Sequence, residues 1–297
     1  MKSLLFLILI LGLVTAADAQ RRPAAAPVKT VIFAVLNDGK AIEPIGYIGA
    51  KGSMTPAIDG ASEAPLLTAF HRTYFAKGKM FPLIFGGKVA GNVTVASSDP
   101  RGECVNYLAN VATKTTRSAL KGNIMALATN AKIAKPGSGI RRLPTPAERA
   151  EIETLVRETL IKNAISSDIA KYHNLTALDV NNDGQADMVG SFWVEPSATE
   201  REVLFFIAEL GADKKYRFGY SESRRIKQAE TLSEDIKDVD TGVYHERLLD
   251  IFDVDGDGDS EIFSYVMSFE GAGFNVYKRQ GEIWAKHFEA SNYHCGY

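Results

Sequence analysis

The chain has 297 residues, of which 45% are hydrophobic and 24% charged, and its formal net charge is -2. This composition is that of an ordinary globular protein. It excludes a collagen, a wholly disordered polymer and a disulfide-dense miniprotein. A dedicated nucleic-acid-binding protein usually carries a clear basic excess, so we expect no nucleic-acid partner. The length suffices for one large domain or two ordinary ones.

Residues 1–19 have the layout of a secretory signal peptide. Lys2 supplies a positive start, residues 4–14 are apolar, and residues 17–19 form a small-x-small cleavage site. The apolar run is too short to cross a bilayer comfortably, although a retained N-terminal anchor is the alternative. We therefore predict a soluble mature protein without a transmembrane segment. It would be secreted, periplasmic or at the cell surface.

After a Pro/Ala linker at residues 20–27, residues 28–134 are predicted to form an antiparallel β unit. Apolar, β-branched runs alternate with turn signals such as Asn37-Asp38-Gly39 and Gly86-Gly87. The predicted strands cover residues 31–36, 66–75, 80–85, 88–96, 104–112 and 123–128.

Residues 135–172 are predicted to be a linker followed by one amphipathic helix. Thr145, Pro146 and Glu148 combine an N-cap, a proline in the first turn and a capping box. The residues behind them at helical spacing are Ile152, Leu155, Val156, Thr159, Leu160 and Asn163. A second short helical turn is expected over residues 167–172.

Residues 173–297 contain two similar units, each of which reads strand, acidic loop, strand, turn, strand, turn, strand. Each unit is a four-stranded meander of the size of a propeller blade. Two blades cannot close a propeller, so either the N-terminal unit adds strands or the two meanders pack face to face. The predicted fold class is mainly β, with blade-like antiparallel meanders carrying calcium hairpin loops, an N-terminal β unit and one helix. The Tyr-His pairs at 172–173 and 244–245 are interpreted as strand packing.

The acidic loops of the two units fit the pattern D-x-[DN]-x-D-G-x-x-[DE]. Calcium takes six to eight oxygen ligands at about 2.3–2.6 Å, and side chains at alternate positions of a tight loop can converge on one ion. The predicted ligands of the first loop are Asp179, Asn181, Asp183, Gln185 and Asp187. Those of the second are Asp253, Asp255, Asp257, Asp259 and Glu261. Gln185 and Asp259 would contribute their main-chain carbonyls.

We therefore predict two calcium sites, with the second loop the tighter because it carries more carboxylates. An EF-hand is excluded, because position 12 is Gly190 or Ser264 and the flanks are β-branched and aromatic. Magnesium fits less well, since it demands a small octahedron and keeps its waters. The alternative is an Asp/Gly-rich turn without an ion.

The succession of hydrophobic strand, acidic loop and hydrophobic strand resembles the calcium loops of FG-GAP and VCBS-type repeat proteins and of integrin α-chain propellers. The resemblance covers about residues 173–297 and includes both loops position by position. It implies secreted or surface proteins in which calcium stiffens β blades, often used in adhesion or carbohydrate contact. Two units are fewer than the about seven blades of a closed propeller. Residues 28–172 show no such resemblance.

The chain has two cysteines, Cys104 and Cys295, and neither lies in a C-x-x-C pair. In an oxidising compartment two such cysteines can form a disulfide, which would tie the C-terminal tail to the N-terminal half. Two unpaired cysteines remain the alternative, because the sequence gives no distance between them.

No residue pattern typical of a catalytic or organic-cofactor site is present. His245-Glu246 begins like a zinc-protease motif, but Leu249 stands where the second histidine is needed. We therefore expect a secreted calcium-binding β-repeat protein that is a non-enzymatic surface or extracellular module for adhesion to a protein or glycan partner. The alternative is an exported hydrolase with an unrecognised site in residues 28–172 and structural calcium loops.

Overall fold

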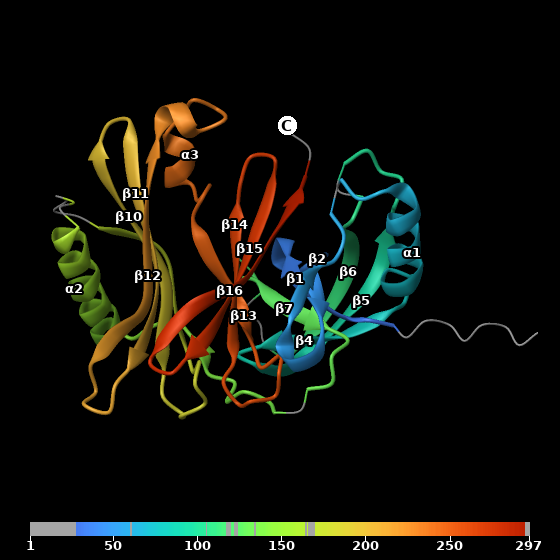
Figure 1. Ribbon diagram of the computed structural model, residues 1–297, viewed down its shortest axis with the longest axis horizontal. Helices are drawn as coiled ribbons and strands as arrows, with labels where there is room; N and C mark the ends of the chain where they lie inside the picture. Colours follow the sequence, from blue (N-terminus) through green and yellow to red (C-terminus); the bar gives the residue numbers. More distant parts are fainter. Residues whose placement is uncertain are drawn as a thin grey trace, which may run out of the picture.

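The computed structural model describes residues 28–294 except 60, 105, 117–119, 122–123, 134, 164 and 166–169. The predicted signal peptide, the linker at residues 20–27 and Cys295 lie outside the described residues. The described part is mainly β, as predicted, and contains three antiparallel sheets stacked between helices α1 and α2 (Figure 1). None of its helices combines the length and the apolar character that a membrane crossing requires.

The N-terminal strands form a closed six-stranded antiparallel barrel, in the order β1-β7-β4-β5-β6-β2 and back to β1, with β3 added to β2. The strands are β1 (Thr30–Leu36), β2 (Ala41–Ile48), β3 (Met54–Pro56), β4 (Met80–Phe85), β5 (Lys88–Ser98), β6 (Ala109–Thr115) and β7 (Ala126–Thr129). The short helical turns η1 (Asn37–Gly39) and η2 (Ala50–Gly52) follow β1 and β2. The turn signal at 37–39 is confirmed, since these three residues have positive φ and join β1 to β2.

The predicted strand at residues 66–75 is wrong, because this segment is helix α1 (Ala64–Tyr74). Leu67, Phe70, His71 and Tyr74 are buried, which is the spacing of one helical face. The apolar members of this face pack into the core inside the barrel. The local apolar run therefore had the period of a helix and not that of a strand.

Strand β2 was not predicted, because Pro44 and Gly46 are unfavourable in a strand. The barrel accommodates Pro44 at a bulge, where the register passes from Ile32–Gly46 to Phe33–Pro44 and leaves Ile45 as the extra residue. The predicted strands at 104–112 and 123–128 begin later than expected, at Ala109 and Ala126.

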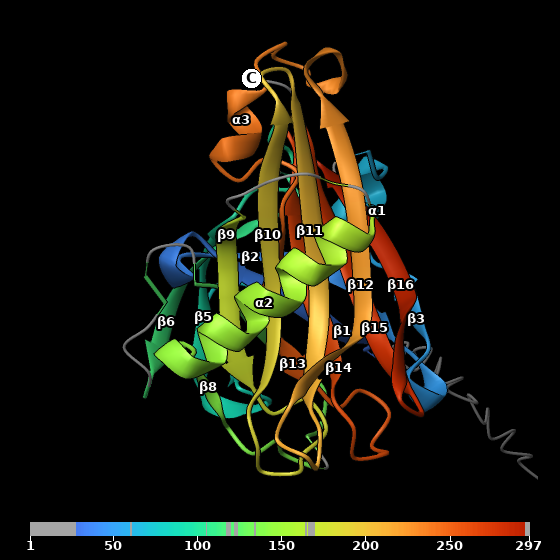
Figure 2. The ribbon, with the colours of Figure 1, turned by 90° about the vertical axis from the view of Figure 1, so that its left-hand side faces the viewer.

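Helix α2 (Pro146–Lys162) begins as predicted. Thr145 Oγ1 accepts a hydrogen bond from the N–H of Glu148 at 3.3 Å, and the N–H of Thr145 donates to Glu148 Oε2 at 2.7 Å. Its buried face of Ile152, Val156 and Leu160 lies across a five-stranded sheet (Figure 2). That sheet has the order β12-β11-β10-β9-β8. Its strands are β8 (Arg141–Arg142), β9 (Lys171–Leu178), β10 (Asp187–Ser197), β11 (Glu200–Leu210) and β12 (Tyr216–Lys227).

The helical turn expected over residues 167–172 is wrong where it can be checked, because Lys171 and Tyr172 belong to β9. Residues 167–169 lie outside the described residues. The expectation of a single helix is also wrong: the described part contains α1, α2 and a third, short helix, α3 (Lys237–Asp240). α3 follows β12 and the turn η3 (Gln228–Glu230).

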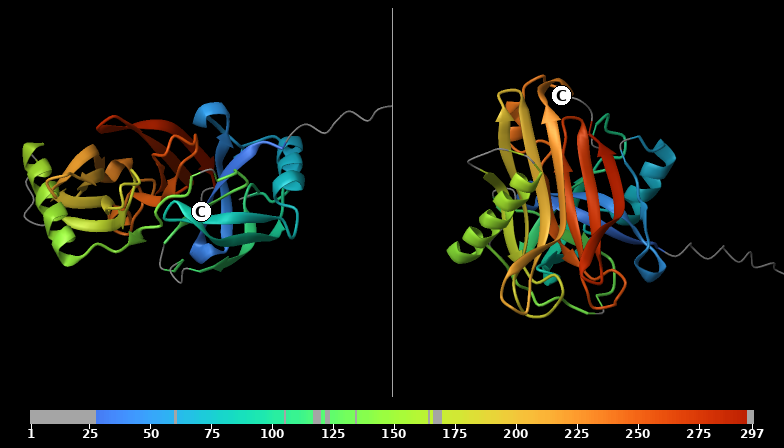
Figure 3. Two further views of the ribbon diagram at one scale, coloured as in Figure 1. Left: turned by 90° about the horizontal axis from the view of Figure 1, so that it is seen from below. Right: turned by 60° about the vertical axis from the view of Figure 1, so that its left-hand side comes forward.

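The last four strands form a meander in the order β13-β14-β15-β16. They are β13 (Glu246–Phe252), β14 (Glu261–Met267), β15 (Gly271–Gln280) and β16 (Ile283–Tyr293). Neighbouring residues point to opposite faces: Ile262 packs toward the five-stranded sheet and Phe263 toward the barrel. The two meanders thus pack face to face, which was one of the two expected arrangements, and the second is sandwiched between the first and the barrel (Figure 3).

The end of β16 is attached to the barrel. Asn292 Nδ2 donates to Glu43 Oε1 at 2.7 Å, and His294 Nε2 lies 3.0 Å from the same oxygen. Cys104 is disulfide-bonded, whereas its predicted partner, Cys295, lies outside the described residues.

Candidate metal centre

The two predicted calcium loops lie side by side. Loop one (residues 179–187) joins β9 to β10, and loop two (residues 253–261) joins β13 to β14. Asn182 Nδ2 donates to the carbonyl oxygen of Gly258 at 2.5 Å, and the N–H of Ser260 donates to the carbonyl oxygen of Val180 at 3.2 Å. The face-to-face packing of the meanders therefore brings both acidic segments to one end of the sandwich.

The two loops share one hydrogen-bond pattern. With the loop residues numbered 1 to 9, the side chain at position 1 accepts a hydrogen bond from the backbone N–H of position 6, and the side chain at position 3 accepts one from position 5. The side chain at position 5 accepts the N–H of position 7, and the side chain at position 9 accepts the N–H of position 2. The donor–acceptor pairs are Gly184–Asp179, Asp183–Asn181, Gln185–Asp183 and Val180–Asp187 in loop one, and Gly258–Asp253, Asp257–Asp255, Asp259–Asp257 and Val254–Glu261 in loop two. The residues that match in sequence thus also match in structure.

Position 6 of each loop requires glycine because the backbone there has a positive φ angle. Gly184 has φ +82° and Gly258 has φ +111°, a region that L side chains rarely adopt. Nothing lies within 4 Å of a Cβ built on Gly184, so space is not the constraint there. The glycine lets the chain reverse so that the side chains on either side face inward.

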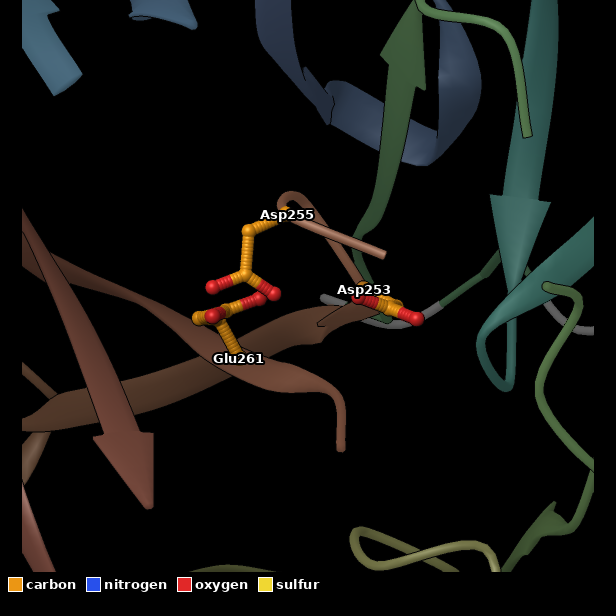
Figure 4. Close-up of side chains that lie close together, drawn as sticks. All are labelled: Asp253, Asp255 and Glu261. Atoms are coloured by element: carbon orange, nitrogen blue, oxygen red, sulfur yellow. The ribbon is translucent and has the colours of Figure 1, made fainter. Parts of the chain in front are cut away.

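Loop two brings three of its five carboxylates close together. Ligand atoms of Asp253, Asp255 and Glu261 lie within 4.8 Å of one another (Figure 4). In Asp255, Asp257 and Glu261 one oxygen accepts a backbone N–H, and the other accepts from Lys278 Nζ. The distances from Lys278 Nζ are 3.1 Å to Asp257 Oδ2 and 2.9 Å to Glu261 Oε1. These oxygens are therefore arranged to surround a cation, and the ammonium of Lys278 lies among them.

The electrostatics of loop two agree with this arrangement. Burial raises the pKa of Asp253 and of Glu261 above their ordinary values. Burial opposes the charge of Lys278 too, but its hydrogen bonds to Asp255, Glu261 and Asp257 outweigh this and raise its pKa. The lysine thus neutralises part of a carboxylate cluster that would otherwise repel itself.

The sequence did not predict the role of Lys278, because this residue lies on β15 and not in the loop. The sequence gives one signal for this role, which is the difference in charge between Lys278 and the matching position of the first unit. Met188 pairs with Ala208 in the first sheet, and Ile262 pairs with Tyr277 in the second. The next positions along the partner strands are Glu209 and Lys278, so the two units carry opposite charges there.

The carboxylates of loop one do not form such a group among the residues that the structure describes. Asp187 uses both oxygens on backbone N–H groups, those of Val180 at 3.1 Å and Leu210 at 2.9 Å. Its burial raises its pKa to about 7. Asp183 Oδ2 accepts from Gln185 Nε2 at 3.0 Å. In loop two Asp253 likewise accepts backbone N–H groups with both oxygens, those of Gly256 and Gly258. The two loops therefore differ in their remaining carboxylates, since in the described part only those of loop two share a side-chain cation.

Loop two also contacts the barrel. A Cβ on Gly52 would lie 2.7 Å from Cβ of Asp255, and Lys135 Nζ donates to the carbonyl oxygen of Asp257 at 3.1 Å. Loop two therefore lies where the barrel and both sheets meet, so any change in its rigidity acts on that junction.

The histidines of the recurring Tyr-His pairs pack against each other between the sheets. The rings of His173 and His245 have centroids 4.4 Å apart. Burial lowers the pKa of His173 to about 4 and that of His245 to about 3. These properties are those of neutral packing residues, in line with the sequence interpretation.

Comparison with known proteins finds no family model, no curated protein and no solved structure that matches this chain. The functional argument therefore depends on the residues themselves.

Proposed function

We propose that this chain is a secreted calcium-binding β protein whose role is to bind a protein or glycan partner at a cell surface or outside the cell, without catalysis. The observation that carries the proposal is the shared hydrogen-bond pattern of loops one and two, together with the convergence of loop-two carboxylate oxygens on the single cation Lys278. The resemblance of residues 173–297 to FG-GAP and VCBS-type loops and the predicted signal peptide are in accord with it.

The donor set of loop two fits calcium. Asp253, Asp255, Asp257 and Glu261 supply hard carboxylate oxygens, and the carbonyl of Asp259 adds another at position 7. Lys278 would have to leave the centre, because an ammonium and a divalent ion cannot share it. Bound calcium would replace one positive charge by two and hold more oxygens at once. It would thereby stiffen the junction between barrel and sheets.

Thermal unfolding of chelated protein tests the proposal. Calcium should raise the melting temperature with a saturable dependence on its concentration, and magnesium should do so less. Asp257→Asn should remove most of the calcium shift, and Asp183→Asn should remove less. In both variants the asparagine keeps an oxygen that can accept the backbone N–H two residues further on, that of Asp259 or of Gln185. Asp213→Asn, in an exposed hairpin, is the matched control. An unchanged melting curve up to millimolar calcium would contradict the proposal.

The second candidate is an exported hydrolase. In residues 28–172, His71 Nδ1 lies 2.8 Å from Ser98 Oγ, but its Nε2 contacts the backbone oxygen of Asn106 and not a carboxylate. A stronger observation lies outside that range. The buried Glu246 has a raised pKa, caused mainly by burial, and borders a cavity of about 210 Å³ that Glu222 and Glu289 also line.

Glu246→Gln discriminates the two candidates. A glycosidase or esterase activity in the secreted protein that this variant loses would favour the hydrolase. The hydrolase candidate fails if the protein hydrolyses no glycoside or ester substrate tested, or if wild type and Glu246→Gln have equal activity.

A further inference from the structure

One arginine in the described part, Arg247, is half-buried and has no ion-pair partner among the described residues. Arg247 lies on β13, and its side chain is half-buried, with its Nε shielded from solvent. Its guanidinium has no carboxylate within ion-pair distance among the described residues, and its Nε makes no hydrogen bond. Its guanidinium carbon lies 5.6 Å from the ring centroid of Tyr265.

This arrangement differs from that of the mostly buried arginines. Arg141 pairs with Asp250 at 3.0 Å, and Arg201 pairs with Asp240 at 2.6 Å. A guanidinium removed from water is costly unless an anion compensates it. An arginine held without such an anion therefore indicates a place for one from outside the chain.

Arg247 borders a cavity of about 310 Å³ whose lining is basic. The wall is built from β8, β9, β13, the start of α2 and the segment before β7. It includes three arginines, Arg141, Arg149 and Arg247, beside the neutral His173, and none of its lining residues is Asp or Glu. A second cavity, of about 390 Å³, shares Arg247, Ile124 and Met125 with the first, and its lining also includes Asp38 and Lys40.

Arg149 supplies a second uncompensated positive charge. Its guanidinium carbon lies 4.4 Å above the ring centroid of Tyr172, and it makes no ion pair in the described part. Stacking on tyrosine leaves the edge of the guanidinium, with its N–H donors, available to an anion. In addition, Asn174 Oδ1 is buried at this wall without a hydrogen-bond partner, so the cavity also has a place for a donor.

We propose that this cavity binds a small organic oxyanion, a carboxylate or a phosphate ester, with its charged group held by Arg247 and Arg149. Met125 and Leu248 line the same cavity and provide an apolar contact for the body of the ligand. Guanidinium groups bind both kinds of oxyanion through paired N–H donors, whereas halide ions cannot use that geometry. This site is separate from loops one and two and does not depend on calcium.

Titration of chelated protein with sodium benzoate, and separately with inorganic phosphate, tests the proposal. Sodium chloride keeps the ionic strength constant, and amide chemical shifts and melting temperature report binding. At least one probe should bind saturably, and Arg247→Gln should weaken it by about tenfold or more. Which probe binds more tightly distinguishes a carboxylate ligand from a phosphate ligand.

Two further variants keep the test decisive if Arg247→Gln unfolds. Arg149→Gln replaces a residue at the cavity mouth and should also weaken the probe. Arg217→Gln, an exposed arginine paired with Asp213, should leave its affinity unchanged. The proposal is overturned if neither probe binds saturably, or if the probe binds Arg149→Gln and every folded Arg247 variant as tightly as it binds wild type.

Discussion

The ammonium nitrogen of Lys278 lies 2.9 Å from Oε1 of Glu261, at the point where the carboxylates of loop two converge. Loop two therefore contains its own monovalent counter-ion, carried on the neighbouring strand. The corresponding position of the first sheet is Glu209, which pairs with Arg279 at 2.9 Å instead. The two loops share their backbone pattern but differ in what compensates their charge.

Lys278→Met is expected to have opposite effects without and with calcium. In chelated protein it should lower the free energy of unfolding by about 1–2 kcal/mol, because the loop-two carboxylates lose their counter-ion. With calcium it should increase affinity, because the ion no longer displaces an ammonium. Urea unfolding and calcium titration measure the two effects. Lys286→Met, on β16, is the control. Weaker calcium binding in Lys278→Met would contradict this account.

The His173–His245 pair should make the fold sensitive to acid. Both pKa values lie below the ordinary value of 6.5, at about 4 and about 3, so the folded state favours neutral rings. Their stabilising contribution is complete above about pH 6.5. It falls as the pH drops toward 4, because the unfolded chain then binds protons that the folded chain does not.

The raised pKa of Asp187, about 7 against an ordinary 3.8, acts in the opposite direction throughout that range, because the folded chain then binds a proton that the unfolded chain does not. The measurement is therefore a difference: the free energy of unfolding at pH 7 minus that at pH 5, in wild type and in His173→Asn/His245→Asn. Wild type should lose about 4 kcal/mol more than the double variant. Equal losses in the two proteins would contradict the assignment of neutral buried rings.

Arg141→Met should destabilise the contact between barrel and sandwich. Asp250 is fully buried and accepts hydrogen bonds from the N–H of Gly86 at 3.0 Å and from Arg141 at 3.0 Å. Removing the guanidinium leaves a buried carboxylate uncompensated, which costs about 3–5 kcal/mol. Arg142→Met removes a more exposed pair with Glu148 and should cost about 1 kcal/mol or less. Chemical denaturation compares the two, and similar losses would contradict the importance of burial here.

Features fixed by neighbouring residues could be predicted from the sequence. The capping box of Thr145 and Glu148, the turn at Asn37 and the succession of strands around the acidic loops are of this kind. Their hydrogen bonds and φ angles involve residues a few positions apart. The loops themselves could be located because glycine at position 6 has a backbone requirement that the sequence displays.

Features that depend on distant segments could not be predicted. Closure of the barrel depends on pairing of β7 with β1, and β2 forms a strand despite Pro44 because a bulge absorbs it. α1 is a different case, because the helical spacing of Leu67, Phe70 and Tyr74 is a local feature that the strand prediction for residues 66–75 missed. Lys278 and the cavity at Arg247 become visible only when strands far apart in the chain are placed together.

Direct calcium titration of chelated protein by calorimetry, in wild type and in Asp257→Asn, tests the central claim most directly. The account predicts saturable binding of two calcium ions per chain, the tighter of which is lost in Asp257→Asn. Absence of saturable binding at millimolar calcium, or identical titrations of the two proteins, would contradict it.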